Sequence, residues 1–323
     1  MFLLTILGIA LQTALGFQGA SYALSATGLN VHFGYTGLSN FGHVGFMLVG
    51  AYGVAIAVDR GWPLWTGVLL GLGAAVALGL LMGLPTLRLR GDYLAIATIA
   101  VAEILRLVAN AGPSVKVTGS SRGLAIPSSV FQAHNPIPKR SYGIGSSFVF
   151  SSRQLWGMAW TWGLVALCCL LVWALMRSPW GRVLRAIRED EDAARALGKN
   201  VVAYKLQAFV LGGAIGALAG IMYALDASSV NPTTWVATLT FALYAVVILG
   251  GPGRVLGPVV GAVLYWFLFS LTEGVLSHLW FPISDTTIGA VRLALVGVGL
   301  MALMVFRPQG ILGNRKEMLA GAR

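Results

Sequence analysis

One segment of this sequence matches the residue pattern of a catalytic motif. Gly119-Ser120-Ser121-Arg122-Gly123 fits the G-x-S-x-G pattern of a serine nucleophile. That pattern requires a strand–turn–helix setting, whereas this copy lies in a long polar stretch between prolines, so we do not expect a hydrolase. Gly198-Lys199-Asn200 lacks the upstream glycine and the hydroxyl residue of a phosphate-binding P-loop. We therefore expect no catalytic residue and no cofactor bound by this chain itself.

Metal-binding patterns are also missing. There is no H-E-x-x-H motif, and metal-ligand spacing is not found among the four histidines, which are His32, His43, His134 and His278. Cys168 and Cys169 are neighbours in an apolar run, so in a helix they point in different directions. We interpret them as buried free thiols and expect no metal site.

Two groups of polar residues fall in surroundings that are otherwise apolar. Glu103 and Arg106 lie in an apolar helix, where each would cost ~2.5–3.5 kcal/mol at a bilayer centre, and their i, i+3 spacing allows them to pair. We favour a structural ion pair over a substrate contact and keep both. A lone membrane histidine is more often a packed, hydrogen-bonded group than a ligand. The second group consists of Tyr35, Ser39, Asn40 and His43. It adjoins a stretch that could line a cavity, so these four residues are candidate pathway residues together with Glu103 and Arg106.

The elements that position these residues are membrane helices. Of 323 residues, 57% are hydrophobic and only 10% are charged, against ~25% charged in soluble domains. The net charge of +11 could indicate nucleic acid, but the basic residues sit mainly in short loops beside apolar spans. The positive-inside rule, by which loops rich in Lys and Arg stay on the cytoplasmic side of the membrane, explains the positions of these basic residues better. We predict an all-α polytopic membrane protein forming a single domain over residues 1–323.

The apolar runs give the expected order of spans. Residues 2–25 could span once, and residues 28–46 are too polar and too rich in glycine for one continuous helix, so we predict a broken or re-entrant element there, followed by a span over 44–58. Further spans are predicted at 63–84, 93–110, 154–176, 204–225, 236–249, 256–271 and 288–306. Glycines at four-residue spacing predict close helix packing, notably at Gly67, Gly71, Gly79, Gly212, Gly216 and Gly220.

Residues 177–205, called here the charged loop, set the orientation. The charged loop holds seven Lys/Arg and four acidic residues between two apolar spans, so we predict that it is cytoplasmic and available to a partner. Alternation then puts residues 111–153 outside and the basic tail 307–323 in the cytoplasm.

The charged loop is predicted to contain two short helices. Ser178-Pro179 is typical of a helix start, with serine as the cap and proline in the first position. Trp180, Val183, Leu184 and Ile187 would form one apolar face. Asp190 or Asp192 could cap a second helix that ends at Gly198.

Seven short blocks occur in order along the chain: Gly37–His43, Leu87–Ile96, Glu103–Leu107, Thr118–Leu124, Leu184–Glu191, Val247–Gly251 and Phe306–Gly310. Together they resemble the permease family of branched-chain amino acid ABC importers, specifically its LivM-type subunit, and in that family's order they cover nearly the whole chain. Two positions depart from the family pattern: Ser120 stands where a second glycine is usual, and Pro252 follows a glycine pair.

The charged loop carries a further likeness. Asp192-Ala193-Ala194 followed by Gly198 resembles the E-A-A-x-x-x-G loop of ABC-importer permeases, with Asp in place of Glu. In that family the loop docks in a groove of the ATPase subunit, and the alanine pair would allow close packing. The resemblance implies that ATPase coupling involves Arg185, Arg188, Glu189, Asp190, Glu191, Asp192, Ala193, Ala194 and Gly198.

The same resemblance implies a five-part importer in the bacterial inner membrane. This permease would pair with a related second permease and with two cytoplasmic ATPase subunits, which would bind the ATP and Mg²⁺. A periplasmic binding protein would deliver Leu, Ile or Val. Urea, short amides or another small solute stay open as substrates. A secondary transporter or channel is the main rival, but acids within the spans are scarce. A membrane enzyme would need a catalytic constellation that the sequence does not contain.

Overall fold

The computed structural model describes residues 2–87, 91–126, 128–144, 148–276, 289–291, 294, 297–299, 301 and 309–313. Most of the expected span 288–306 and of the tail 307–323 therefore lies outside the described residues, as do residues 88–90 and His278. The longer helices are α1 Phe2–Leu15, α2 Phe17–Asn30, α3 His43–Asp59, α4 Leu64–Thr86, α5 Gly91–Asn110, α8 Ser152–Arg177, α11 Val201–Ala227, α12 Ala237–Gly250 and α13 Gly257–Leu276.

Several of these helices have the length and composition of membrane spans. α4, α8, α11 and α13 each meet both conditions. Residues 92–110 and 112–118 meet them together but are bent by 65° at the break between them. Residues 5–15, α3 and α12 are shorter apolar helices. The expectation of an all-α polytopic membrane protein is confirmed by this set of helices.

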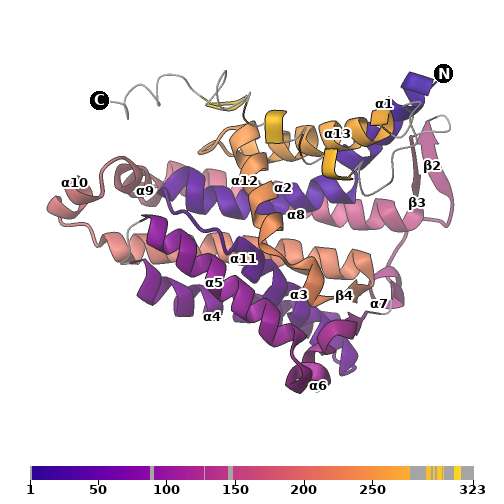
Figure 1. Ribbon diagram of the computed structural model, residues 1–323, viewed down its shortest axis with the longest axis horizontal. Helices are drawn as coiled ribbons and strands as arrows, with labels where there is room; N and C mark the ends of the chain where they lie inside the picture. Colours follow the sequence, from indigo (N-terminus) through magenta and orange to yellow (C-terminus); the bar gives the residue numbers. More distant parts are fainter. Residues whose placement is uncertain are drawn as a thin grey trace.

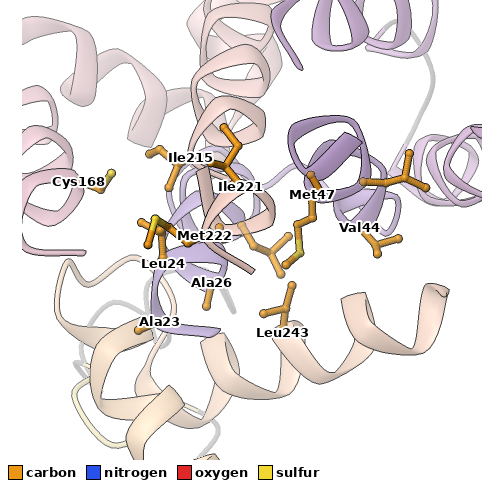
Figure 2. Close-up of a cluster of buried hydrophobic side chains, with 14 of the residues drawn as sticks. Ala23, Leu24, Ala26, Val44, Met47, Cys168, Ile215, Ile221, Met222 and Leu243 are labelled. Atoms are coloured by element: carbon orange, nitrogen blue, oxygen red, sulfur yellow. The ribbon is translucent and has the colours of Figure 1, made fainter. Parts of the chain in front are cut away.

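α2, α3 and α11 form the centre of the molecule (Figure 1). Buried apolar side chains from these helices meet near Met47 and Met222, and α8 and α12 contribute Cys168 and Leu243 (Figure 2). α4 and α8 instead bury one side and expose leucines on the other, as helices that border lipid do. The polar residues of the broken segment therefore lie inside a shell of apolar helices.

The prediction of a single span over residues 2–25 is wrong. The helix stops at Leu15 and restarts at Phe17, because Gly16 adopts an extended backbone. A Cβ at Gly16 would lie 2.5 Å from the carbonyl oxygen of Gln12, so this turn suits glycine. α1 then packs on α13, whereas α2 enters the centre against α11 and α8.

The two ends of the helix bundle differ (Figure 1). α9, Pro179–Glu189, and α10, Glu191–Ala196, project from one end. The opposite end carries the structured connection expected at 111–153. Two small antiparallel sheets that the all-helical expectation did not contain lie there: β2–β3 within the connection, and β1–β4, which joins the connection to the segment after α11. The short elements are α6 Val115–Thr118, α7 Ser128–Gln132, β1 Leu124–Ala125, β2 Ser141–Ile144, β3 Phe148–Ser151 and β4 Ser229–Val230, with 3₁₀ turns η2 Gly112–Ser114, η3 Ser120–Arg122 and η4 Pro232–Thr234.

Candidate functional site

The helix breaks where α2 would otherwise continue into α3. α2 passes directly into the π-helical turn η1, Val31–Tyr35, and an irregular segment then leads to His43 at the start of α3. Gly34 allows a close approach at this point, since a Cβ there would lie 2.5 Å from the backbone nitrogen of Gly253. The break expected within 28–46 is therefore present, and π-helical turns are frequent at functional sites.

Two buried histidines and an asparagine form a polar cluster at the break. Nε2 of His32 donates to the carbonyl of Phe209 at 2.8 Å, so with a single ring proton its Nδ1 accepts from the amide of Asn40 at 3.1 Å. Nε2 of His43 donates to the carbonyl of Ser25 at 3.1 Å. The two imidazole rings meet edge to face with centroids 5.4 Å apart. His32 thus ties the break to α11, and His43 ties it to α2.

Glycines on α11 make room for both imidazole rings. A Cβ at Gly212 would lie 2.4 Å from Nε2 of His32, and a Cβ at Gly216 would lie 2.7 Å from the ring of His43. Neither histidine is exposed, and Asn40 is also fully buried. The cluster is therefore packed shut in this conformation.

Two further side chains tie the break to distant parts of the chain. Asn30 donates to the carbonyl of Arg254 and accepts from the backbone nitrogen of Gly253, both at 2.9 Å. Arg188, on α9, donates through Nη1 to the carbonyl of Gly34. The broken helix, α9 and the turn after α12 consequently meet at one point.

The six candidate pathway residues do not form one group. Tyr35 is buried at the end of η1 and Ser39 is half-buried in the irregular segment. Arg106 donates to the carboxylate of Glu103 at 2.9 and 2.5 Å, so these two residues satisfy each other on α5. α5 touches the break at Thr98 instead, whose hydroxyl accepts from the backbone nitrogen of Phe41 at 3.1 Å.

The six glycines proposed for helix packing all lie at helix crossings. On α4, a Cβ at Gly67 would lie 2.9 Å from Cα of Val54, and one at Gly71 would lie 2.8 Å from the carbonyl oxygen of Gly50. On α11, a Cβ at Gly220 would lie 2.0 Å from the carbonyl oxygen of Met47. Gly79 meets α11, and the contacts of Gly212 and Gly216 are those already described. These glycines let helix backbones approach each other directly.

Both helices of the charged loop begin where the sequence predicts, but only α10 has the predicted side-chain cap. α9 follows Ser178, although the Ser178 hydroxyl donates back to the carbonyl of Leu175 and does not cap α9. Oδ1 of Asp190 accepts from the backbone nitrogens of Asp192 and Ala193, both at 2.9 Å. α10 then ends before Gly198, whose φ of +75° suits glycine.

The charged loop has a packed side and an exposed tip. Ala194 is buried with Ile187 and Val201 in a small apolar cluster. Its neighbour Ala193 is exposed, and Leu197 is 79% exposed at the tip. The alanine pair is therefore divided, since Ala194 packs inside the loop and Ala193 faces outwards. This leaves a small apolar surface surrounded by charged side chains.

The acidic residues of the loop also have different partners. Glu191 accepts from Lys205 of α11 at 2.5 Å and from Arg195 at 2.9 Å. Asp192, with its side chain 92% exposed, accepts only from Arg195 among the side chains of the described part of the chain. Glu191 thus fastens α10 to α11, whereas Asp192 faces solvent.

A cavity of about 600 Å³ lies where the charged loop meets the break. The base of the charged loop lines this cavity, whereas the tip does not. The walls come from α8, α9, η1 and the turn after α12: Trp173, Met176, Arg177, Arg185, Arg188, Glu189, Tyr35, Gly253, Arg254 and Val255.

The G-x-S-x-G segment does not have the setting of a nucleophile elbow. Ser121 lies in η3, between α6 and β1 in chain order, where no strand leads into the serine. Ser120 has a φ of +50°, which explains why glycine suits this position, and its hydroxyl donates to the carbonyl of Asn110 at 2.6 Å. Among the described residues, no group of three or more His, Cys, Asp or Glu side chains could hold a metal ion.

A family model and several curated relatives show the family of this chain. The model of the family "Branched-chain amino acid transport system / permease component" matches residues 13–306. The high-affinity branched-chain amino acid permease LivM of Salmonella typhimurium is 31% identical, and that of Escherichia coli is 32% identical; each alignment covers 92% of this chain and 69% of the relative. LivH of Escherichia coli, a permease of the same transport system, is 28% identical over 92% of both chains.

Proposed function

This chain belongs to the branched-chain amino acid transport system permease family, and we propose that it translocates branched-chain amino acids as the LivM-type permease of an ABC importer. It is a multi-pass membrane protein and a transport subunit rather than an enzyme. The substrate class rests on the names of its relatives, and urea, short amides or another small solute are the alternatives.

The partners follow from the same membership. A second permease related to LivH would complete the membrane part, because LivM and LivH relatives are both similar to this chain. Two ATPase subunits would bind ATP and Mg²⁺ on the cytoplasmic side, and a periplasmic binding protein would deliver substrate. The charged loop and the tail 307–323 would face the cytoplasm of a bacterial inner membrane, with 111–153 on the outside.

One observation carries the coupling role of the charged loop. Its exposed tip, with Ala193 and Leu197, is continuous with α9, and Arg188 of α9 is hydrogen-bonded to Gly34 in the broken helix. A displacement of the tip would therefore be transmitted through Arg188 to the broken helix and its polar cluster of His32 and His43. Packed helices that switch between two discrete arrangements transmit such movements.

The test is a reconstituted complex of this chain with the second permease, both ATPase subunits and the binding protein in proteoliposomes. Ala193→Trp should abolish leucine-stimulated ATP hydrolysis and leucine uptake, because the bulky ring would block close docking at the tip. Ala133→Trp is the matched control, since Ala133 is an exposed alanine in the 111–153 connection.

Both variants should insert into membranes as the wild type does. ATP hydrolysis that stays coupled in Ala193→Trp would contradict the docking role. Uptake of urea or another solute in place of leucine by the wild-type complex would contradict the substrate class but not the family.

A further inference from the structure

The cavity at the base of the charged loop carries an excess of positive charge. Four arginines line it, Arg177, Arg185, Arg188 and Arg254, with Glu189 as the one acidic lining residue. One carboxylate can balance only one of the four guanidinium charges, so the remaining like charges repel one another unless a further anion lies among them. The cavity therefore has the charge of an anion site.

The described acidic residues do not neutralise three of these arginines. Arg185 donates to the carbonyl of Met176 and Arg188 to that of Gly34, while the Arg177 guanidinium stacks 4.2 Å above the ring of Trp173. None of the three makes an ion pair with Asp or Glu within the described ranges. Guanidinium groups offer forked donors that match the oxygens of a phosphate group.

The outer wall of the cavity leads onto a surface suited to acyl chains. Leu167, Leu170 and Trp173 follow one another at three-residue spacing on α8, and Arg177 continues the same stripe one turn later. The two leucines are each 60% exposed and Trp173 is 43% exposed. Tryptophan with an adjacent arginine is typical of the level where lipid headgroups meet the hydrocarbon.

We propose that this cavity binds the headgroup of an anionic phospholipid, with the phosphate among the arginines and the acyl chains along the exposed stripe of α8. The site is separate from the tip that is proposed to dock the ATPase. It requires neither the substrate nor the partners, so its failure would leave the proposed function standing.

The experiment uses the purified full-length chain in a mild detergent, incubated with equal amounts of phosphatidylglycerol and phosphatidylcholine. Native mass spectrometry reports which lipid is retained first. The wild type should prefer phosphatidylglycerol, and Arg177→Gln/Arg185→Gln should weaken that preference by about tenfold or more. Arg182→Gln/Lys199→Gln removes the same charge from exposed positions of the charged loop that do not line the cavity, and should keep the preference.

Arg177→Lys/Arg185→Lys is the control for a loss of binding through misfolding. It keeps the charge, so it should retain most of the preference for phosphatidylglycerol. A wild type without preference, or an unchanged preference in Arg177→Gln/Arg185→Gln, would overturn the proposal. Glycerophosphoglycerol, the same headgroup without acyl chains, separates a lipid from a soluble phosphate compound. It should fail to displace phosphatidylglycerol at equal concentration, and displacement would assign the cavity to a soluble anion.

Discussion

Arg188 in α9 is hydrogen-bonded to the backbone carbonyl of Gly34 in the π-helical turn, although 154 residues separate them in sequence. The arginine side chain also lies close to Gly37 and Gly253, where a Cβ would be 3.3 and 3.0 Å from its atoms. One side chain thus spans the gap between the charged loop and the break in the membrane helix.

Replacing this arginine should uncouple the two regions. Arg188→Gln removes a charged donor from a buried carbonyl, an interaction worth about 1.5–3 kcal/mol. We expect leucine-stimulated ATP hydrolysis by the reconstituted complex to fall by about tenfold or more. Arg182→Gln, an exposed arginine of the same helix, should leave it within about twofold. Equal rates in the two variants would show that the Arg188 contact does not transmit the movement.

The glycine beneath His43 should be intolerant of a methyl group. Gly216→Ala would put a Cβ 2.7 Å from the imidazole ring, and overpacking of this kind costs about 1–3 kcal/mol. The apparent melting temperature of the purified chain, measured by size-exclusion chromatography after heating, should fall.

Gly73→Ala on α4 is the matched control for that change. A Cβ at Gly73 meets nothing within 4 Å among the described residues, and alanine is favoured over glycine in a helix by about 1 kcal/mol. This variant should be as stable as the wild type or more stable. A lower melting temperature for Gly73→Ala than for Gly216→Ala would refute the packing argument.

The cap of α10 should control the order of the tip. Asp190→Ala removes the acceptor of two backbone N–H groups, at a cost of about 0.5–2 kcal/mol. Amide hydrogen exchange within α10 should become about fivefold faster. Asp192→Ala should change exchange less, because its exposed ion pair with Arg195 contributes little. Identical exchange in both variants would mean that Asp190 does not hold the helix.

The Glu103–Arg106 pair should behave as a structural unit. Glu103→Gln alone leaves a half-buried arginine without its carboxylate, so it should lower thermal stability more than Glu103→Gln/Arg106→Gln does. The double variant should keep leucine uptake within about twofold. Loss of uptake in a double variant that is stable would instead identify the pair as a substrate contact.

Local signals predict much of the helical architecture. The start of α9 is predicted by Pro179 in its first turn and the end of α10 by Gly198, because both residue types act on the backbone within a few residues. The break before His43 also follows from local polarity and glycine content. In contrast, residues 2–25 contain no charged residue and no proline, so the sequence predicts one apolar run across the break at Gly16.

The contacts of the candidate site could not be read from the sequence. His32 accepts from Asn40 nearby but donates to Phe209, 177 residues away, and no periodicity marks that partner. Residue type and spacing test His32 only as a metal ligand. The pairing of Arg188 with Gly34 is hidden for the same reason, since backbone acceptors carry no residue-type signature.

The capping of the charged loop tip has a consequence for how this permease can change. Asp190 caps α10 and Asn200 caps α11, each bonding a backbone nitrogen three residues further on, while Gly198 makes the turn between them. The caps and the turn of this short stretch are thus formed by its own residues, while Ala194 and Glu191 fasten it to neighbouring residues of α9 and α11. If the tip docks the ATPase as proposed, exchanging this stretch and its packing residues between permeases should alter which ATPase is recognised, provided that the recipient keeps an arginine at the position of Arg188.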